Sequence, residues 1–560
     1  MTTSALDDVL DTEAIALALP GGEALVRASE MPDALYRLVA GRLAEIEHIS
    51  GDGNRVVAIH RPGALIGPAQ ILGASVYSTT ITALRDSELL AVPVDRLEAL
   101  LREDPALLAE IARAALTRMG AGEPAERRKT SILGFVGVCD SVSVRDLADR
   151  VAAAMRGMGL KVALLGVEAD DSPPSTLSML EAANDYVLLA AERKETEFTS
   201  FCSRQIDRLI LVGAADTPLP EGPFTLAAAA IQRHRLVDVI LVQPPNAGHA
   251  ANSTRWLSAA PVSRLFNIRK GDRADIDRLA RVYTGRSVAL VLSGGGARAY
   301  AHVGAAKALA ELGVPVDFLG GASMGAVVAA GMAMGWGIDE LDRRIQAAFV
   351  ESSPLSDIAF PLVAMTRGHL VEARLKAHFG DIQISDLWRP FLCVSTDLTL
   401  GEAHPHRRGL LRAALRASLS LPGVLPPVVE DGHVLVDGAL TRNLPVDMVR
   451  EQHDGVTIGV DVAASTHGLR PDDLRLHPGG LRWLLSGAWR KGPPIVSVLI
   501  RSATLPSARA HALERDALSV EIVPDVTGVG LQDWKAYAPA VRAGYAATMA
   551  QADRLRALAV

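Results

Sequence analysis

The chain is poor in cysteine and in aromatic side chains. Its three cysteines, Cys139, Cys202 and Cys393, are odd in number and far apart in the sequence. This spacing excludes a disulfide framework and a cysteine-based zinc site. Aromatic residues make up only 4% of the 560 residues, but hydrophobic residues make up 49%, which is enough for well-buried globular domains.

The chain also lacks long apolar runs and a basic leader. No uninterrupted apolar run reaches the about 18 residues that a spanning helix needs. The run "MGAVVAAGMAMGWG" (324–337) is short and rich in glycine, so it predicts a buried helix. The first twenty residues have no basic segment of the kind that opens a secretory signal. We therefore expect a cytoplasmic protein whose contact with a membrane is peripheral, at its inner face.

The chain is slightly acidic overall. A formal net charge of −7 gives no general attraction to nucleic acid, so no nucleic-acid partner is expected.

The order of the patterns predicts a multidomain chain. Residues 1–120 predict short strands broken at Gly and Pro, as in a small β-barrel or β-roll, followed by a helical stretch. Within them, "ALYRLVAGRLAEIEHI" predicts two strands around a glycine turn.

Residues 131–280 alternate between apolar runs of strand length and helical stretches, which predicts a central parallel α/β domain. No Gly-Lys-Ser/Thr follows the first of these runs, so a structural or regulatory role is favoured there.

The stretch "VALVLSGGGARAYAHVG" (288–304) leads from an apolar strand into three glycines and a helix. Gly294, Gly296 and Ala299 match a dinucleotide-binding fingerprint, and Asp317 follows at about the 20-residue spacing of its ribose-binding acid. The same loop could instead direct backbone N–H groups at the oxyanion of an acyl-transfer intermediate. The loop by itself leaves both open.

A second motif favours acyl transfer. Gly321-x-Ser323-x-Gly325, between a predicted strand and a predicted helix, is typical of a nucleophile elbow. Further on, Asp437-Gly438 follows a short predicted strand and offers a carboxylate base. A dinucleotide enzyme would leave the elbow and this Asp-Gly without a role.

Histidines are the other candidate bases. An α/β-hydrolase needs a histidine after its acid, and the candidates have no local motif: they are His453, His467, His477 and His511. His302 follows the glycine loop, and we interpret it as a helix residue packed beneath that loop. The segment "EAHPHRRG", with His404, His406, Arg407 and Arg408, could form a metal or phosphate site. We favour an exposed loop there, with headgroup contact open.

Five ordered motifs carry a family resemblance: "SGGGAR", "GASMGA", "STDLTLGE", "RASLSLPGVLPP" and "VDGALTRNLPV". Together they resemble the patatin-like phospholipases, and more closely the bacterial relatives of neuropathy target esterase. The resemblance covers 285–455 and implies a C-terminal α/β hydrolase domain there. We expect 456–560 to be a helical extension packed on it.

The resemblance also implies the roles of the site residues. The family's Ser–Asp dyad carries over onto Ser323 and Asp437. Its oxyanion glycines fall on Gly294, Gly295 and Gly296. The remaining motif positions are Arg298, Gly321, Gly325 and Gly438. Ala299 and Ala439 replace glycines that are common in the family, and both are small enough to leave the chemistry intact.

The N-terminal part resembles a cyclic-nucleotide-binding domain across 1–120, through "LVAGRL", "RPGALIG" and "SELLAVPVDRLEALL". That family binds the ribose and the cyclic phosphate through a Glu and an Arg. Here Pro68 holds the first position and Tyr77 falls near the second, so the charge-assisted bonds are lost. We expect the pocket to be degenerate and cyclic nucleotide not to bind.

These features predict a serine hydrolase that cleaves carboxylic esters of phospholipids or lysophospholipids, with no metal and no cofactor. Two alternatives stay open: an acyltransferase that uses the same acyl-enzyme, and a regulatory protein of the cyclic-nucleotide type.

Overall fold

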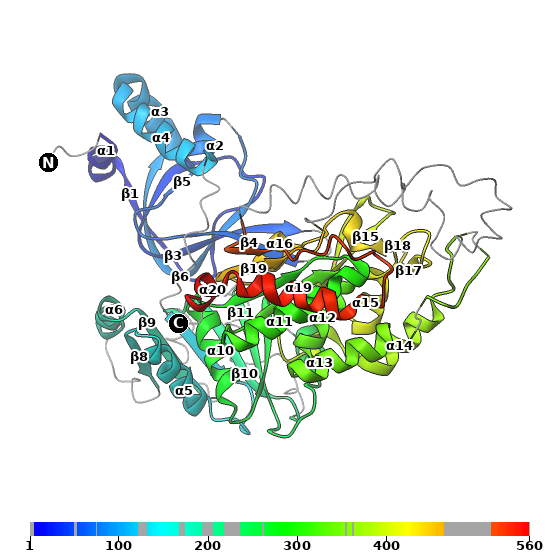
Figure 1. Ribbon diagram of the computed structural model, residues 1–560. Coiled ribbons are helices and arrows are strands. Elements are labelled where there is room, and N and C mark those ends of the chain that lie inside the picture. Colours follow the sequence, from blue (N-terminus) through cyan, green and yellow to red (C-terminus); the bar gives the residue numbers. More distant parts are fainter. Residues whose placement is uncertain are drawn as a thin grey trace. The chain divides into compact units, whose positions relative to one another are not determined.

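The computed structural model describes eleven stretches of the chain: 5–49, 53–73, 75–120, 132–166, 174–192, 205–217, 236–259, 262–352, 355–360, 363–463 and 517–558 (Figure 1). The chain divides into two compact units. The first comprises Met1–Val242 and Arg255–Leu265, and the second comprises Gln243–Thr254 and Phe266–Val560.

The first unit opens with an antiparallel β-roll. Its strands are β1 (Ile15–Leu19), β2 (Ala24–Val26), β3 (Ala34–Ile49), β4 (Gly53–His60), β5 (Leu65–Ile66) and β6 (Thr80–Pro93). They pair in the order β1-β6-β3-β4, with β2 on β6 and β5 on β3. The accompanying helices are α1 (Ala5–Glu13), α2 (Pro68–Gly73), α3 (Val94–Glu103) and α4 (Pro105–Gly120).

One local prediction for this part is wrong. Residues 34–49 form a single strand rather than two strands around a turn. Gly41 has a positive φ of 95°, but shifts of register on either side of it let β3 continue along β6. The glycine therefore marks a bulge, which is a common use of glycine inside a strand.

A parallel sheet follows, as the alternating pattern predicted. Its strands are β7 (Ile132–Gly137), β8 (Val162–Leu165), β9 (Tyr186–Ala191), β10 (Arg208–Ala214), β11 (Val237–Gln243) and β12 (Arg264–Arg269), in the order β12-β11-β10-β7-β9-β8. Helices α5 (Val144–Gly157), α6 (Pro174–Ala183) and α9 (Ser253–Ala259) belong to the same stretch of chain. Every residue of β9, β10 and β11 is buried, which explains why these strands are largely apolar and do not alternate with polar residues.

Ion pairs join the β-roll to this parallel sheet within the first unit. Arg42 of β3 donates from Nη1 to Oδ2 of Asp207, 2.7 Å away, and both side chains are buried. Arg85 of β6 binds both carboxylate oxygens of Glu181 on α6, each at 3.0 Å. Breaking the buried pair of Arg42 and Asp207 should therefore destabilise this unit, because it takes a partner away from a buried charge.

In the part of the second unit that the structure describes, one mixed sheet has eight strands. They are β13 (Val288–Leu292), β14 (Phe318–Ala322), β15 (Phe391–Asp397), β16 (Glu402–His406), β17 (Val428–Glu430), β18 (His433–Asp437), β19 (Val456–Val460) and β20 (Val520–Ile522). The pairing order is β17-β18-β15-β14-β13-β19-β20, and β16 also pairs with β15.

Helices of the second unit are α10 (Arg273–Tyr283), α11 (Ala301–Glu311), α12 (Ser323–Ala333), α13 (Ile338–Ile345), α14 (His369–Phe379), α15 (Leu411–Ser418), α16 (Val446–Arg450), α19 (Tyr537–Met549) and α20 (Ala552–Arg556). We expected the chain after 455 to be helical. Its described part instead adds β19 and β20 to the sheet before α19 and α20. The reason is that the apolar run of β19 pairs in parallel with β13 along its whole length.

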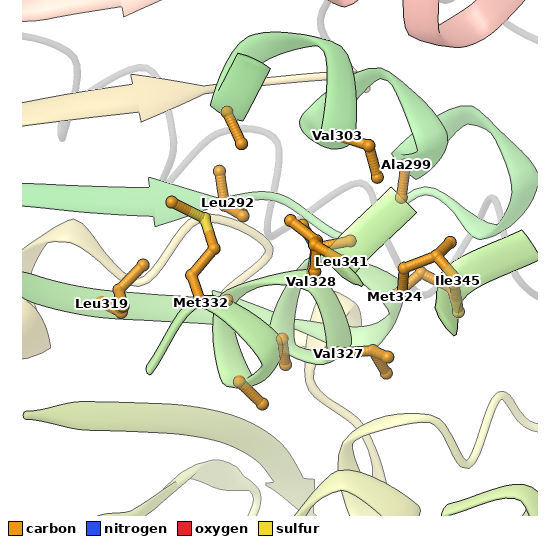
Figure 2. Close-up of a cluster of buried hydrophobic side chains, with 14 of the residues drawn as sticks. Leu292, Ala299, Val303, Leu319, Met324, Val327, Val328, Met332, Leu341 and Ile345 are labelled. Atoms are coloured by element: carbon orange, nitrogen blue, oxygen red, sulfur yellow. The ribbon is translucent and has the colours of Figure 1, made fainter. Parts of the chain in front are cut away.

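The predicted buried helix is confirmed. Every residue of α12 is buried, which suits a helix without a polar face. Its side chains Met324, Val327, Val328 and Met332 lie among apolar residues of β13, β14, α11 and α13 (Figure 2). Among the described residues, no helix is long and apolar enough to cross a membrane.

Candidate active site

Ser323 lies at the junction of β14 and α12. Its φ of 52° is in the left-handed region, which a serine adopts only where its surroundings enforce it. The flanking glycines allow this sharp turn to approach β13. A Cβ on Gly325 would lie 2.4 Å from the carbonyl oxygen of Ser293, and one on Gly321 would lie 2.7 Å from that of Leu292.

The strand register brings Asp437 to Ser323. On one edge of β15, β16 pairs with Cys393–Asp397, so β14 and β18 must share the other edge. On that edge Ala322 is opposite Val394, and Asp437 is opposite Ser395. The carboxyl ends of β14 and β18 therefore meet head-on, at neighbouring positions of β15.

The two side chains are in direct contact. Ser323 Oγ donates to Asp437 Oδ2 across 2.6 Å, and Asp437 is only 2% exposed. Burial raises the pKa of the Asp437 carboxyl to about 6, although hydrogen bonds from Ser323 Oγ and the Ala439 N–H act in the opposite direction. A carboxylate of this basicity can take a proton near neutral pH much better than an ordinary aspartate.

The end of α15 and the two residues that follow it contact both Ser323 and Asp437. The Ser323 N–H donates to Ser418 Oγ at 2.9 Å, and the Asp437 N–H donates to the Ser420 carbonyl at 3.0 Å. Thr396 Oγ1 donates to the Asp437 carbonyl at 3.0 Å. The motif "RASLSLPGVLPP" signals this segment in the sequence, but it gives no roles to its serines, because their partners lie on other elements.

The glycine loop lies against the serine. A Cβ on Gly294 would come within 3.0 Å of Ser323 Cβ and 2.8 Å of Asn443 Oδ1, so any larger residue here would displace one of these two side chains. The Gly294 N–H donates to Asn443 Oδ1 at 3.0 Å. The N–H groups of Gly295 and Gly296 bond to none of the described residues. Asn443 is a residue of the "VDGALTRNLPV" motif whose role the sequence did not indicate.

The far side of the loop is held by the segment that follows β20. The Ala297 N–H donates to the Leu531 carbonyl at 2.9 Å, and Arg298 Nε donates to the Val529 carbonyl at 2.7 Å. Gly296, with φ of 55°, passes so close to Leu531 that a Cβ would lie 2.2 Å from its carbonyl oxygen. Arg298 therefore braces the loop and does not contact Ser323 or Asp437.

Gly438, the motif glycine that follows Asp437, is also required by a close approach of two backbone segments. A Cβ on Gly438 would lie 2.1 Å from the carbonyl oxygen of Val394. Only glycine lets the chain leave β18 beside β15 at this point.

None of the described candidate histidines contacts Ser323. His302 is fully buried on α11, bonds through Nε2 to the Ser293 carbonyl at 2.8 Å, and has its pKa lowered by burial to about 4. His453 is buried beside Thr457 and stacks on Phe318, at the amino end of β14. His467, His477 and His511 lie outside the described residues.

The acid of the dinucleotide fingerprint is already engaged. Arg281 binds both carboxylate oxygens of Asp317, at 2.6 and 3.0 Å, and the Val288 N–H donates to the same carboxylate at 3.0 Å. Asp317 is 1% exposed, so it has no free face for a ribose.

The segment of His404 and His406 is not an exposed loop, and that prediction is wrong. It forms β16, where antiparallel pairing with β15 buries His406 and places its Nε2 2.8 Å from Ser395 Oγ. Near it, His433 Nδ1 lies 2.5 Å from Asp397 Oδ2. The described residues contain no group of three or more His, Cys, Asp or Glu side chains placed to hold a metal.

Comparisons with known proteins agree with this architecture. Residues 290–450 match the family model of patatin-like phospholipase, and residues 16–104 match that of the cyclic nucleotide-binding domain. An uncharacterized NTE family protein of Mycobacterium bovis is 30% identical over 561 residues, which cover 96% of this chain and 92% of that protein. The neuropathy target esterase sws of Drosophila melanogaster is 28% identical over 84% of this chain, but over only 37% of its own length.

Among solved structures, the catabolite activator protein of Thermus thermophilus is 22% identical, covering 32% of this chain and 76% of its own, with a TM-score of 0.20. The N-terminal assignment therefore rests on the family model. The chain belongs to the NTE family, and it combines an N-terminal cyclic nucleotide-binding domain with a C-terminal patatin-like phospholipase domain, the enzyme domain of the protein.

Proposed function

We propose that this chain is a serine hydrolase that cleaves carboxylic esters of phospholipids or lysophospholipids, with Ser323 as nucleophile and Asp437 as general base. The observation that carries the proposal is the 2.6 Å hydrogen bond from Ser323 Oγ, on its strained elbow, to a buried carboxylate. Membership of the family supports a phospholipid or lysophospholipid ester as substrate. The hydrogen bond supports a serine nucleophile with a carboxylate base.

Asp437 accepts the proton of Ser323 while Oγ attacks the ester carbonyl carbon. The tetrahedral intermediate then collapses, the bond to the leaving alcohol oxygen breaks, and Asp437 returns the proton to that oxygen. An acyl-enzyme remains on Ser323. Water attacks it next and gives its proton to Asp437. When the second intermediate collapses, the carboxylic acid leaves and Ser323 recovers its proton.

The glycine loop is the proposed oxyanion site. Within it, the N–H groups of Gly295 and Gly296 are unengaged by the described residues, whereas Gly294 donates to Asn443. We therefore propose Gly295 and Gly296 as donors, and Gly294 as the position that brings the loop against Ser323. Removal of one such donor typically costs about 3 kcal/mol of transition-state stabilisation.

Peripheral membrane contact is supported by exposed apolar side chains. β15 and β18 extend beyond the end of β14, and Leu398, Leu400 and Val429 are more than half exposed at the far end of this extension. Leu398 is three residues past Ser395, so this end lies about 10 Å beyond the level of Asp437. Asp397 fixes the turn by accepting the N–H groups of Thr399 and Leu400.

This contact is tested by flotation with phosphatidylcholine vesicles. A Leu398→Ser/Leu400→Ser double variant should bind vesicles more weakly and lose activity on them, while keeping its activity on a soluble short-chain ester. Ile15→Ser, an exposed apolar position of the first unit, is the control. A carbonate wash should release bound wild type. Wild-type vesicle binding by the double variant would refute the contact.

The proposed chemistry is tested by turnover of a chromogenic ester and of lysophospholipid. Asp437→Asn should lose about 10²- to 10⁴-fold in rate, because the base is gone while the shape is kept. Ser323→Ala should lose at least as much. Free fatty acid should be the product; an acylated acceptor instead would indicate the acyltransferase alternative.

Histidine variants are the matched controls for that experiment. His302→Gln and His453→Gln should stay close to wild-type activity, because neither side chain contacts Ser323. His467, His477 and His511 should tolerate the same change. A histidine variant as inactive as Ser323→Ala, together with an active Asp437→Asn, would show that a histidine is the base.

A further inference from the structure

We infer that Ser418 is a positioning residue, whose hydroxyl holds Ser323 in the strained conformation from which Ser323 Oγ reaches Asp437. This inference rests on the proposed function and goes beyond it, because Ser418 bonds to the backbone of Ser323 and not to its nucleophilic oxygen.

The contacts of Ser418 fix the direction of its hydroxyl. The side chain is fully buried, and Oγ donates its single proton to the carbonyl oxygen of Val394 at 2.7 Å. The lone pairs of Oγ therefore face the Ser323 N–H, which donates to them at 2.9 Å. Since Val394 is itself paired with Ala322, the hydroxyl ties the elbow to the neighbouring strand.

The same segment anchors the base two residues later. The Ser420 carbonyl accepts the Asp437 N–H at 3.0 Å. Ser420 Oγ in turn accepts from Arg416 Nη1 at 2.6 Å and donates to the Arg416 carbonyl at 2.9 Å. One short segment thus holds the backbones of both the nucleophile and the base, so it sets the separation between their side chains.

A purely structural role makes a different prediction. Loss of the hydroxyl leaves two buried polar groups, the Ser323 N–H and the Val394 carbonyl, without this partner, and this loss by itself only lowers stability. Loss of positioning also lengthens the bond from Ser323 Oγ to Asp437. That bond lowers the pKa of Asp437, so its weakening raises this pKa further. The pH profile therefore separates the two roles.

The experiment compares Ser418→Ala and Ser418→Cys with wild type in the full chain. Cysteine retains the shape of serine, but its thiol is a weak hydrogen-bonding group. Ser418→Ala should lower kcat by about 10- to 100-fold, as small misplacements of reacting groups do, with KM changed by less than about twofold. Its acidic limb should move to higher pH. Ser418→Cys should fall between it and wild type.

Ser253→Ala is the matched control. Ser253 is also fully buried in the second unit, and its Oγ donates to Asn267 Oδ1 at 3.1 Å, so the variant loses a buried hydroxyl with no link to Ser323. It should keep the wild-type kcat and the wild-type pH profile, whatever its effect on the melting temperature.

The outcomes distinguish this inference from the proposed function. Wild-type kcat and pH profile in folded Ser418→Ala, or in Ser418→Cys if the alanine variant does not fold, overturn the inference while Ser323→Ala and Asp437→Asn remain inactive. Activity in Ser323→Ala or Asp437→Asn overturns the proposed function itself.

Discussion

The buried carboxyl of Asp437 has opposing effects on activity and on stability. Its pKa of about 6 arises from desolvation, which the hydrogen bonds from Ser323 and Ala439 offset only in part. In the proposed mechanism the ionised form is the proton acceptor, and it is also the form that the buried environment disfavours.

The first prediction concerns the pH dependence of activity. Because Asp437 must be ionised to act as a base, kcat/KM should rise with pH through a midpoint near 6 and level off above it. Below that midpoint it should fall about tenfold per pH unit. Initial rates on a soluble ester between pH 4.5 and 8.5 measure this profile. A midpoint near 4 would show that Asp437 is not desolvated in the working enzyme.

The second prediction concerns stability. The folded pKa of about 6 exceeds the ordinary value of 3.8, so the folded chain holds this proton more tightly than the unfolded chain does. The associated stability is therefore present below about pH 4 and is lost as the pH rises to 6. Above pH 6 the loss is on the order of 2–3 kcal/mol.

Asp437→Asn removes this cost, so at pH 8 it should melt at a higher temperature than wild type while remaining inactive. The difference should disappear near pH 4. Thermal melting of both proteins across this range checks it, and equal melting temperatures at pH 8 would contradict the prediction.

At the level of single residues, local motifs predict only part of the site. Ser323 and Asp437 could be proposed because an elbow and an Asp-Gly turn are short patterns with a chemical reason. Ser418 and Asn443 could not, because their partners Ser323, Val394 and Gly294 are distant in the sequence and are brought close only by the folded sheet, which no local pattern reports.

Among the elements, the contact of α11 with α19 depends on two glycines. A Cβ on Gly304 would lie 1.9 Å from the Val541 carbonyl oxygen, and one on Gly544 would lie 1.8 Å from that of Ala301. The two helices therefore pack backbone against backbone, and Figure 1 shows α19 in red alongside α11 in green.

The third prediction is that Gly544→Ala separates these helices and destabilises the second unit by about 1 to 3 kcal/mol, as overpacking of a core does. Thermal melting measures the loss. Gly157→Ala on α5, whose added Cβ meets nothing within 4 Å, is the control and should be neutral or slightly stabilising. A wild-type melting temperature for Gly544→Ala would show that the helices can shift apart without cost.

Elements with strong periodicity were predictable, and the exceptions have physical causes. The buried α12 and the parallel strands follow from apolar runs. Gly41 has the appearance of a turn, yet pairing with β6 on both sides keeps β3 continuous. β16 carries polar residues that suggest a loop, but its pairing with β15 makes it a strand.

At the scale of the whole molecule, the N-terminal domain has the cyclic nucleotide-binding fold, and we expect its pocket to lack the charged groups of a nucleotide site. Pro68 begins α2, and Tyr77 is buried beside Gly67, where an added Cβ would lie 2.7 Å from the Tyr77 hydroxyl oxygen. The fold class of each domain could be predicted from motif order. The arrangement of the ion pairs around Asp207 could not, since those partners are distant in sequence.

The fourth prediction is that the full chain shows no saturable heat with cyclic AMP or cyclic GMP at micromolar concentrations. The reason is that Pro68 and Tyr77 offer neither a carboxylate for the ribose nor a cation for the phosphate. Isothermal titration calorimetry provides the measurement. Clear saturable binding of either nucleotide would mean that other residues of the β-roll have taken over recognition.

The bracing of the glycine loop by Leu531 and Val529 has a consequence for biosynthesis. A ribosome delivers Ser323 and Asp437 well before these two residues, and domains generally fold as they emerge. A nascent chain can therefore already carry the proposed nucleophile and base while Ala297 and Arg298 of its glycine loop still lack their carbonyl partners on Leu531 and Val529. We expect catalytic activity to appear only late in translation, so that an incomplete chain does not hydrolyse nearby lipids.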